Sequence, residues 1–72
     1  MEINDIIEIN DKEYVCFKKV IDNNIKYVYL ISAFEPVEIK FAKELDNEKL
    51  EIINNLEEKQ YANKLLQESM WN

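Results

Sequence analysis

Apolar and polar side chains alternate through the first two thirds of this chain, and the alternation ends near residue 46. It is clean over residues 37–45, where Val37, Ile39 and Phe41 alternate with Glu38, Lys40 and Ala42. Over residues 25–33, Ile25, Tyr27, Tyr29 and Ile31 likewise lie at every second position. A period of two is typical of a β-strand. The same pattern, with many aromatic and β-branched residues, predicts four strands, at about residues 3–9, 14–21, 25–33 and 37–45.

A two-residue turn at residues 23–24 joins the second and third predicted strands. Both residues are asparagine, which tolerates the positive φ that such a turn requires. With this turn Phe17, Val28 and Leu30 share one face of the sheet, and we expect the helix to cover this face because it carries no hydroxyl group. The opposite face is then open and rich in tyrosine, which is typical of binding surfaces. The candidate apolar and aromatic partner-binding residues are Tyr14, Tyr27 and Tyr29.

A helix is predicted over residues 47–69, after an N-cap at Asp46 or Asn47. At about 100° per residue, its apolar residues form two opposite stripes: Leu50, Ile52, Ile53 and Leu56, and then Tyr61, Ala62, Leu65 and Leu66. A straight helix on one sheet buries only one stripe. The helix therefore bends or breaks near residues 54–60, or its second half projects and packs on another protein. If that protein is a second copy, the chain is a homodimer whose self-association residues are Tyr61, Leu65, Leu66, Met70 and Trp71.

Together these elements predict a single α+β domain over residues 1–72, with a four-stranded antiparallel meander followed by one C-terminal helix. No stretch approaches the roughly 20 apolar residues of a membrane span, and nothing after Met1 resembles a signal peptide. We therefore expect a cytoplasmic protein without a membrane partner, in which Cys16 stays reduced.

The composition excludes several kinds of chemistry. The chain has 72 residues with one Cys, no His and no Gly. An intrachain disulfide, a Cys/His zinc site, a glycine-rich phosphate loop and a histidine base are therefore all excluded. Carboxylate pairs on a helix surface stay solvated, whereas acid–base catalysis needs a cleft that shifts their pKa values. We expect no catalytic residue, no metal and no cofactor, and hence no enzyme.

The charge is acidic and unevenly distributed. The formal net charge is −6, and all nine cations are lysines. The acids concentrate in residues 1–13 and 35–58. Such a surface repels nucleic acid and anionic membranes but attracts a basic protein. The candidate electrostatic partner-binding residues are Glu35, Glu38, Glu44, Asp46, Glu48 and Glu51.

In its small size, its acidity, its lack of catalytic groups and its Ile-, Asn- and Lys-rich composition, the chain resembles the small acidic anti-defence proteins encoded by phages, of the anti-CRISPR type. The resemblance is to the class and involves no motif. It implies an inhibitor that mimics nucleic acid and docks on a basic protein target, such as a CRISPR effector or another nuclease, inside a bacterial host cell.

Two other functions are compatible with the sequence. The chain could be a homo-oligomeric accessory domain of a low-GC bacterium, built on the second helical stripe. It could also be a single-stranded nucleic-acid-binding module in which the tyrosines stack on bases beside Lys18, Lys19 and Lys26. The absence of arginine and the acidic flanks argue against direct nucleic-acid binding.

Overall fold

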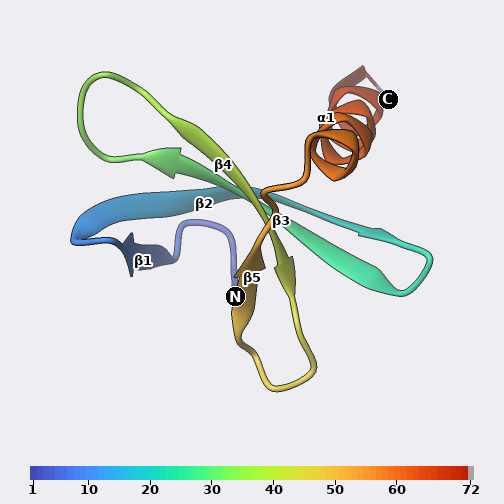
Figure 1. Cartoon of the computed structure of the whole chain (residues 1–72), viewed down its shortest axis with the longest axis horizontal. Coiled ribbons are helices and arrows are strands. Elements are labelled where there is room, and N and C mark those ends of the chain that lie inside the picture. The colour runs from blue at the N-terminus through green and yellow to red at the C-terminus, as the bar shows by residue number, and fades with distance from the viewer. Residues whose placement is uncertain (72) are drawn as a thin grey trace.

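The computed structural model describes residues 1–71, with side chains through Met70. Five antiparallel strands form one strongly curled sheet, and a single helix lies against one of its faces (Figure 1). The fold is therefore α+β, with one strand more than the sequence predicts. The elements are β1 (Ile6–Ile9), β2 (Lys12–Asp22), β3 (Ile25–Ser32), β4 (Ile39–Glu44), β5 (Leu50–Ile52) and α1 (Leu56–Trp71).

The sheet is a simple meander in which each strand pairs with the next along the chain. Asparagine replaces glycine at its tight turns. Residues 10–11 (Asn-Asp) and residues 23–24 (Asn-Asn) all have positive φ, as a two-residue hairpin turn requires. The pairing of Asp22 with Ile25 confirms the predicted turn between β2 and β3.

The fifth strand and the helix boundary correct the prediction of one helix over residues 47–69. A tight turn, in which the Leu45 N–H donates to the Lys49 carbonyl, returns the chain alongside β4. Residues 50–52 then pair with residues 42–44 as β5. The helix begins only after Asn55, whose side-chain oxygen accepts a 3.0 Å hydrogen bond from the N–H of Glu58.

The start of the helix after Asn55 explains why the sequence shows two opposite apolar stripes. The first stripe lies mostly in β5 and the connection after it, and the second stripe lies in α1. Because the two stripes lie mostly in different elements, one helix does not have to bury both of them. The break that the sequence predicts near residues 54–60 corresponds to the start of the helix.

A β-bulge in β2 overturns the predicted assignment of the two sheet faces. The register shifts between Cys16 and Lys18, and the extra residue reverses the alternation on its N-terminal side. Tyr14 therefore lies on the same face as Val28 and Leu30, and Phe17 lies on the opposite face.

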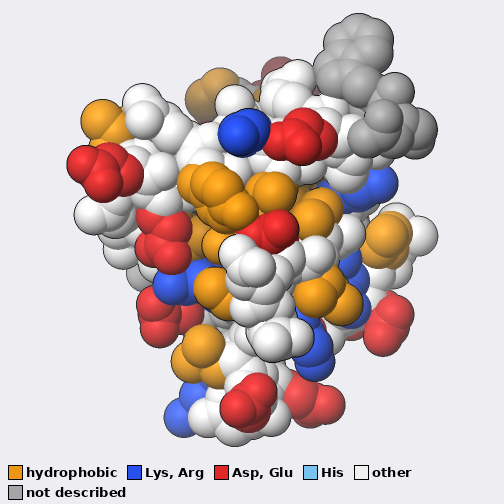
Figure 2. Space-filling model, turned by 90° about the vertical axis from the view of Figure 1, so that its right-hand side faces the viewer, with side chains coloured by type: hydrophobic (Ala, Val, Ile, Leu, Met, Phe, Trp, Pro, Cys, Tyr) orange, Lys and Arg blue, Asp and Glu red, His pale blue; other side chains and the backbone are white. Residues whose placement is uncertain are grey.

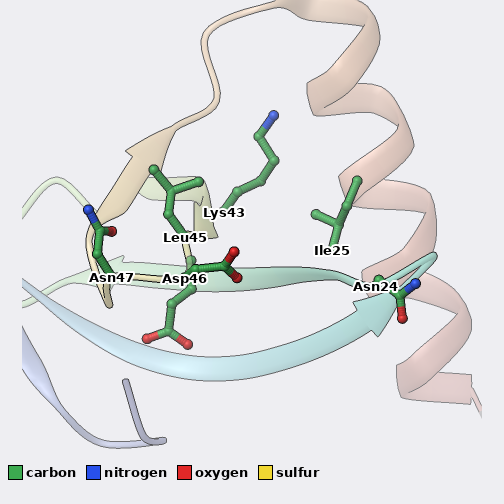
Figure 3. A pocket seen from close by; sticks show the side chains of 7 residues that line it. Asn24, Ile25, Lys43, Leu45, Asp46 and Asn47 are labelled. Carbon is green, nitrogen blue, oxygen red and sulfur yellow. The ribbon is translucent and has the colours of Figure 1, made fainter.

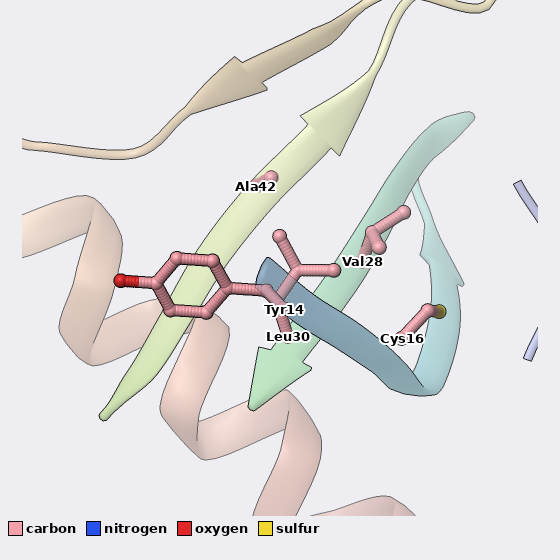
Figure 4. Packing of buried hydrophobic residues seen from close by; sticks show 5 residues of the cluster. All are labelled: Tyr14, Cys16, Val28, Leu30 and Ala42. Atoms are coloured by element: carbon pink, nitrogen blue, oxygen red, sulfur yellow. The ribbon is translucent and has the colours of Figure 1, made fainter. Parts of the chain in front are cut away.

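Each face of the sheet has its own hydrophobic core. The concave core consists of Tyr14, Cys16, Val28, Leu30 and Ala42 (Figure 4). It is closed by partly buried side chains of β1, β5 and the loops, namely Met1, Ile7, Ile9, Phe34, Leu50 and Ile52. The helix core lies between the other face and α1, and consists of Tyr27, Tyr29, Ile53, Ala62 and Leu66, with Phe17, Val20, Phe41 and Leu65 partly buried against them.

The helix thus covers the face that carries Tyr27 and Tyr29, not the face of Leu30. The phenol of Tyr29 explains how a tyrosine face can be buried, because it donates a 2.6 Å hydrogen bond to the carbonyl of Ala62 in α1. A buried hydroxyl is tolerated when it is paired in this way.

Candidate interaction surface

The six acids predicted to bind a partner lie at the two opposite ends of β4. Glu35 and Glu38 belong to the connection between β3 and β4. The other four lie in or beside the β4–β5 hairpin, at the far end of the strand (Figure 1). The structure therefore does not gather the six residues into one patch.

Three of the six acids are engaged within the chain. Glu44 is largely buried and pairs with the amino group of Met1, and this hydrogen bond lowers the pKa of its carboxyl group. Glu38 accepts a 3.2 Å hydrogen bond from the phenol of Tyr14. Glu51 lies 3.5 Å from the ammonium group of Lys43.

Lys43 connects three elements, and the carboxylates of Glu51 and Glu58 balance its positive charge. Its ammonium group lies 2.7 Å from Glu58 in the first turn of α1, in addition to its contact with Glu51 on β5. The hydrogen bond to Glu58 is the main reason that the pKa of Lys43 is raised. These pairs stabilise the junction of sheet and helix, and they leave this lysine no spare charge for an anionic ligand.

Three carboxylates that take part in none of the ion pairs among the described residues lie close together where the β4–β5 hairpin approaches the N-terminal segment. A hollow of about 500 Å³ lies there, lined by Met1, Glu2, Asp5, Ile6, Ile7 and Glu48. We call Glu2, Asp5 and Glu48 the acidic seam. Within the described part of the chain, the ion pairs involve none of these three residues. The acidity of residues 1–13 is visible in the sequence, but their proximity to Glu48 arises only from the curl of the sheet.

A groove of about 540 Å³ lies on the other side of the same hairpin (Figure 3). Its apolar walls are Ile25 and Leu45, both exposed. Because Lys43 and Glu44 are already paired, Asp46 is the groove carboxylate that takes part in none of the ion pairs among the described residues. Figure 2 shows hydrophobic side chains at the centre of one side of the molecule, with acidic side chains and lysines around them.

The three candidate tyrosines are not exposed, which corrects the predicted open tyrosine face. Tyr14 is buried in the concave core, and Tyr27 and Tyr29 are buried in the helix core. Burial raises the pKa of Tyr29 to about 12. Rings that are covered in this way offer no platform on which bases could stack.

The residues predicted to self-associate are divided between the core and the surface. Leu66 is buried and Leu65 is partly buried in the helix core, so both side chains already have intramolecular partners. The phenol of Tyr61 donates a 2.5 Å hydrogen bond to Asp22. Met70 is exposed, and the side chain of Trp71 lies outside the described part of the structure. Of the residues predicted to self-associate, Leu66 is therefore buried within the chain, whereas Tyr61 and Met70 lie at the surface.

The remaining candidate chemical group is Cys16. Its thiol is buried in the concave core, and desolvation raises its pKa, which opposes formation of the reactive thiolate. The described residues contain no group of three or more carboxylate, thiol or imidazole side chains placed to hold a metal ion. Within the same residues, no helix is both long and apolar enough to cross a membrane.

The charged groups of both hollows line open surface and not an enclosed cavity. Comparisons with protein-family models, with curated proteins and with solved structures give no significant match. The functional assignment therefore rests on the residues of this chain.

Proposed function

We propose that this chain is a non-enzymatic protein that binds a basic surface of another protein through its β4–β5 hairpin and N-terminal segment. One observation carries the proposal: the carboxylates of the acidic seam, together with Asp46, come from distant parts of the sequence and have no cationic partner in the described structure. The exposed side chains of Ile3 and Ile6 lie in the same N-terminal region and supply apolar area.

Uncompensated carboxylates favour association with a cationic partner for two reasons. They speed the encounter by long-range attraction, and on contact they exchange water for charge-assisted hydrogen bonds to lysine or arginine. The exposed isoleucines add affinity that does not depend on salt. Such binding weakens as salt rises, because the Debye length falls from about 10 Å at 0.1 M to about 3 Å at 1 M.

The target class that fits this chemistry best is a nucleic-acid-binding protein. Its phosphate-binding groove is basic, and carboxylates at the seam would occupy positions that phosphates otherwise take. The acidity, small size and composition of the chain support an inhibitor of this kind, of phage or mobile-element origin, acting on a CRISPR effector or another nuclease in a bacterial cell. Neither a cofactor nor a metal enters this proposal.

The test measures how the chain affects DNA binding by a panel of purified CRISPR effectors and other basic nucleases. We expect the chain to displace labelled DNA from at least one of them, and less effectively at high salt. The variant carrying Glu2→Gln, Asp46→Asn and Glu48→Gln should compete at least about tenfold less well.

A matched control distinguishes the effect of these carboxylates on DNA displacement from the effect of the net charge of the chain. The variant carrying Asp11→Asn, Glu35→Gln and Glu57→Gln removes the same number of acids elsewhere, and we expect it to stay within about twofold of the parent chain. Equal losses in both variants would show that only net charge matters. Failure to displace DNA from any member of the panel would contradict the proposed inhibitor.

A further inference from the structure

A row of four aliphatic side chains crosses the sheet beside the helix. Ile6 of β1 pairs with Val15 of β2, Val15 pairs with Ile31 of β3, and Ile31 pairs with Ile39 of β4. Residues that pair across neighbouring strands lie on the same face of a sheet. We call these four residues the aliphatic row.

The aliphatic row lies on the face that carries α1. Ile31 is two residues from Tyr29 along β3, and Ile39 is two residues from Phe41 along β4, and these two aromatic rings belong to the helix core. Because side chains alternate along a strand, all four side chains of the row project from that face.

The helix does not cover this row. None of the four residues belongs to either core. Ile6 is 65% exposed and Ile39 is 52% exposed, and the two central residues are half-buried. Figure 1 shows α1 over one side of the molecule, away from the β1–β2 turn and the β3–β4 connection. A strip of the sheet therefore remains open along the flank of α1.

A pair of like charges borders one end of the row. Glu8 of β1 lies directly opposite Glu13 of β2, on the same face as Ile6 and Val15. Like charges in directly opposed positions destabilise a sheet, and the ion pairs in the described structure leave both carboxylates unpaired. At the other end, Ile39 borders a hollow of about 100 Å³ that Lys59 of α1 also lines.

We propose that the aliphatic row is a docking site for a basic amphipathic helix of a partner protein, which packs on the sheet alongside α1. The apolar face of that helix covers the row, and its lysine or arginine side chains neutralise Glu8 and Glu13. Since Lys59 marks the opposite end, the cations of the partner belong at the β1–β2 end. The site adjoins the acidic seam at Ile6, which also lines the hollow of the seam, but it does not depend on the proposed inhibition.

The dimensions and charges favour this occupant over a second copy of the chain. Four strands spaced about 4.8 Å apart span about 14 Å, which corresponds to about 10 residues of helix. A second sheet laid over the row would meet α1, which rises on the same face. A second copy would also add its own net charge of −6 to an acidic border.

The test uses a synthetic helical peptide of about 12 residues, made of leucine, alanine and lysine, with the leucines on one face. One control peptide has the same composition in scrambled order, and another has glutamate in place of lysine. Binding is followed by methyl NMR of the isoleucine and valine residues. We expect the shifts to concentrate at the aliphatic row, and the affinity to exceed that for either control at least about tenfold.

Variants of the protein assign the site. The double variant Ile6→Thr/Ile39→Thr keeps β-branched side chains at exposed positions and should bind the amphipathic peptide about tenfold more weakly. Ile21→Thr, at a position that is 70% exposed outside the row, should bind within about twofold of the parent. The variant carrying Glu2→Gln, Asp46→Asn and Glu48→Gln should also still bind the amphipathic peptide. This outcome distinguishes the docking site from the acidic seam.

Three results would overturn the proposal. The first is a set of shifts centred outside the row. The second is equal affinity for the amphipathic and scrambled peptides. The third is a concentration-dependent dimer of the parent chain that Ile6→Thr/Ile39→Thr dissociates, because the occupant would then be a second copy.

Discussion

The concave face of the sheet is closed by β1, β5 and the loops, whereas the opposite face is covered by one helix over part of its area. The concave core therefore needs no further element. On the helix face, α1 leaves the aliphatic row on one side and the groove of Ile25 and Leu45 on the other. The difference separates two roles: the concave core supports the fold, and the margins of the helix face remain available for contact.

The largest expected effect is on the concave core. Leu30 is fully buried there, and Leu30→Ala should lower the free energy of unfolding by about 3 kcal/mol through lost apolar burial and a residual cavity. Chemical denaturation followed by circular dichroism measures this loss. The control Ile21→Thr, at an exposed position, should change the same quantity by less than about 0.5 kcal/mol. Similar losses in both variants would mean that the concave face is not the main core.

A smaller effect is expected beneath the helix. Leu66 is buried between α1 and the sheet, and Leu66→Ala should cost about 2 kcal/mol. Because α1 covers one side of a sheet that is closed on the other, this variant should open the helix before the strands. Hydrogen exchange should show faster exchange in α1 with little change in β2 and β3. Uniform acceleration in all elements would contradict the proposed independence of the two faces.

The smallest effect on stability is expected at the hydrogen bond between β3 and α1. Tyr29→Phe removes the bond to the Ala62 carbonyl and should cost about 1 kcal/mol at neutral pH. Burial raises the pKa of the Tyr29 phenol from 10.0 to about 12, so folding favours its neutral form. The contribution of the neutral Tyr29 phenol to the free energy of unfolding is therefore fully present below pH 10, and it is lost as the pH rises through about 12.

The measurement for this residue is stability against pH at alkaline values, with tyrosinate absorbance recorded in parallel. The parent chain should lose stability above pH 10, and Tyr29→Phe should reduce that loss. Tyr61 provides a comparison at an exposed position, where the hydrogen bond to Asp22, rather than burial, is the main reason that the pKa of the phenol is raised. We expect Tyr61→Phe to reduce the alkaline loss less than Tyr29→Phe does. If Tyr61→Phe reduced the alkaline loss as much as Tyr29→Phe, burial of Tyr29 would not be the cause.

The sequence predicted the parts of the fold in which the local residue pattern favours the same structure as the tertiary contacts. Alternation along residues 25–33 and the two asparagines of the β2–β3 turn were sufficient to predict the central hairpin and the meander. The fifth strand was missed because residues 50–56 satisfy a helical pattern equally well. What decides between the two is the turn that pairs Leu45 with Lys49, and its formation depends on β4 being present as a template.

The predictable part of the surface was smaller. A single extra residue at the bulge beside Phe17 reversed the faces of β2, and with it the predicted exposure of Tyr14. The acidity of the N-terminal segment was evident from the sequence, but its meeting with Glu48 required the curl of the whole sheet. Likewise, the aliphatic row depends on the register of four strands, which the pattern of one strand does not determine.

The contact between this chain and a nuclease that it inhibits can be mapped residue by residue in solution. Cross-saturation NMR of the isotope-labelled chain reports which residues lie against the unlabelled target. We expect the strongest transfer at the N-terminal segment and the β4–β5 hairpin, including Glu2, Asp46 and Glu48. Transfer confined to the β3–β4 connection or to the solvent side of α1, with none at the hairpin, would contradict the proposed binding surface.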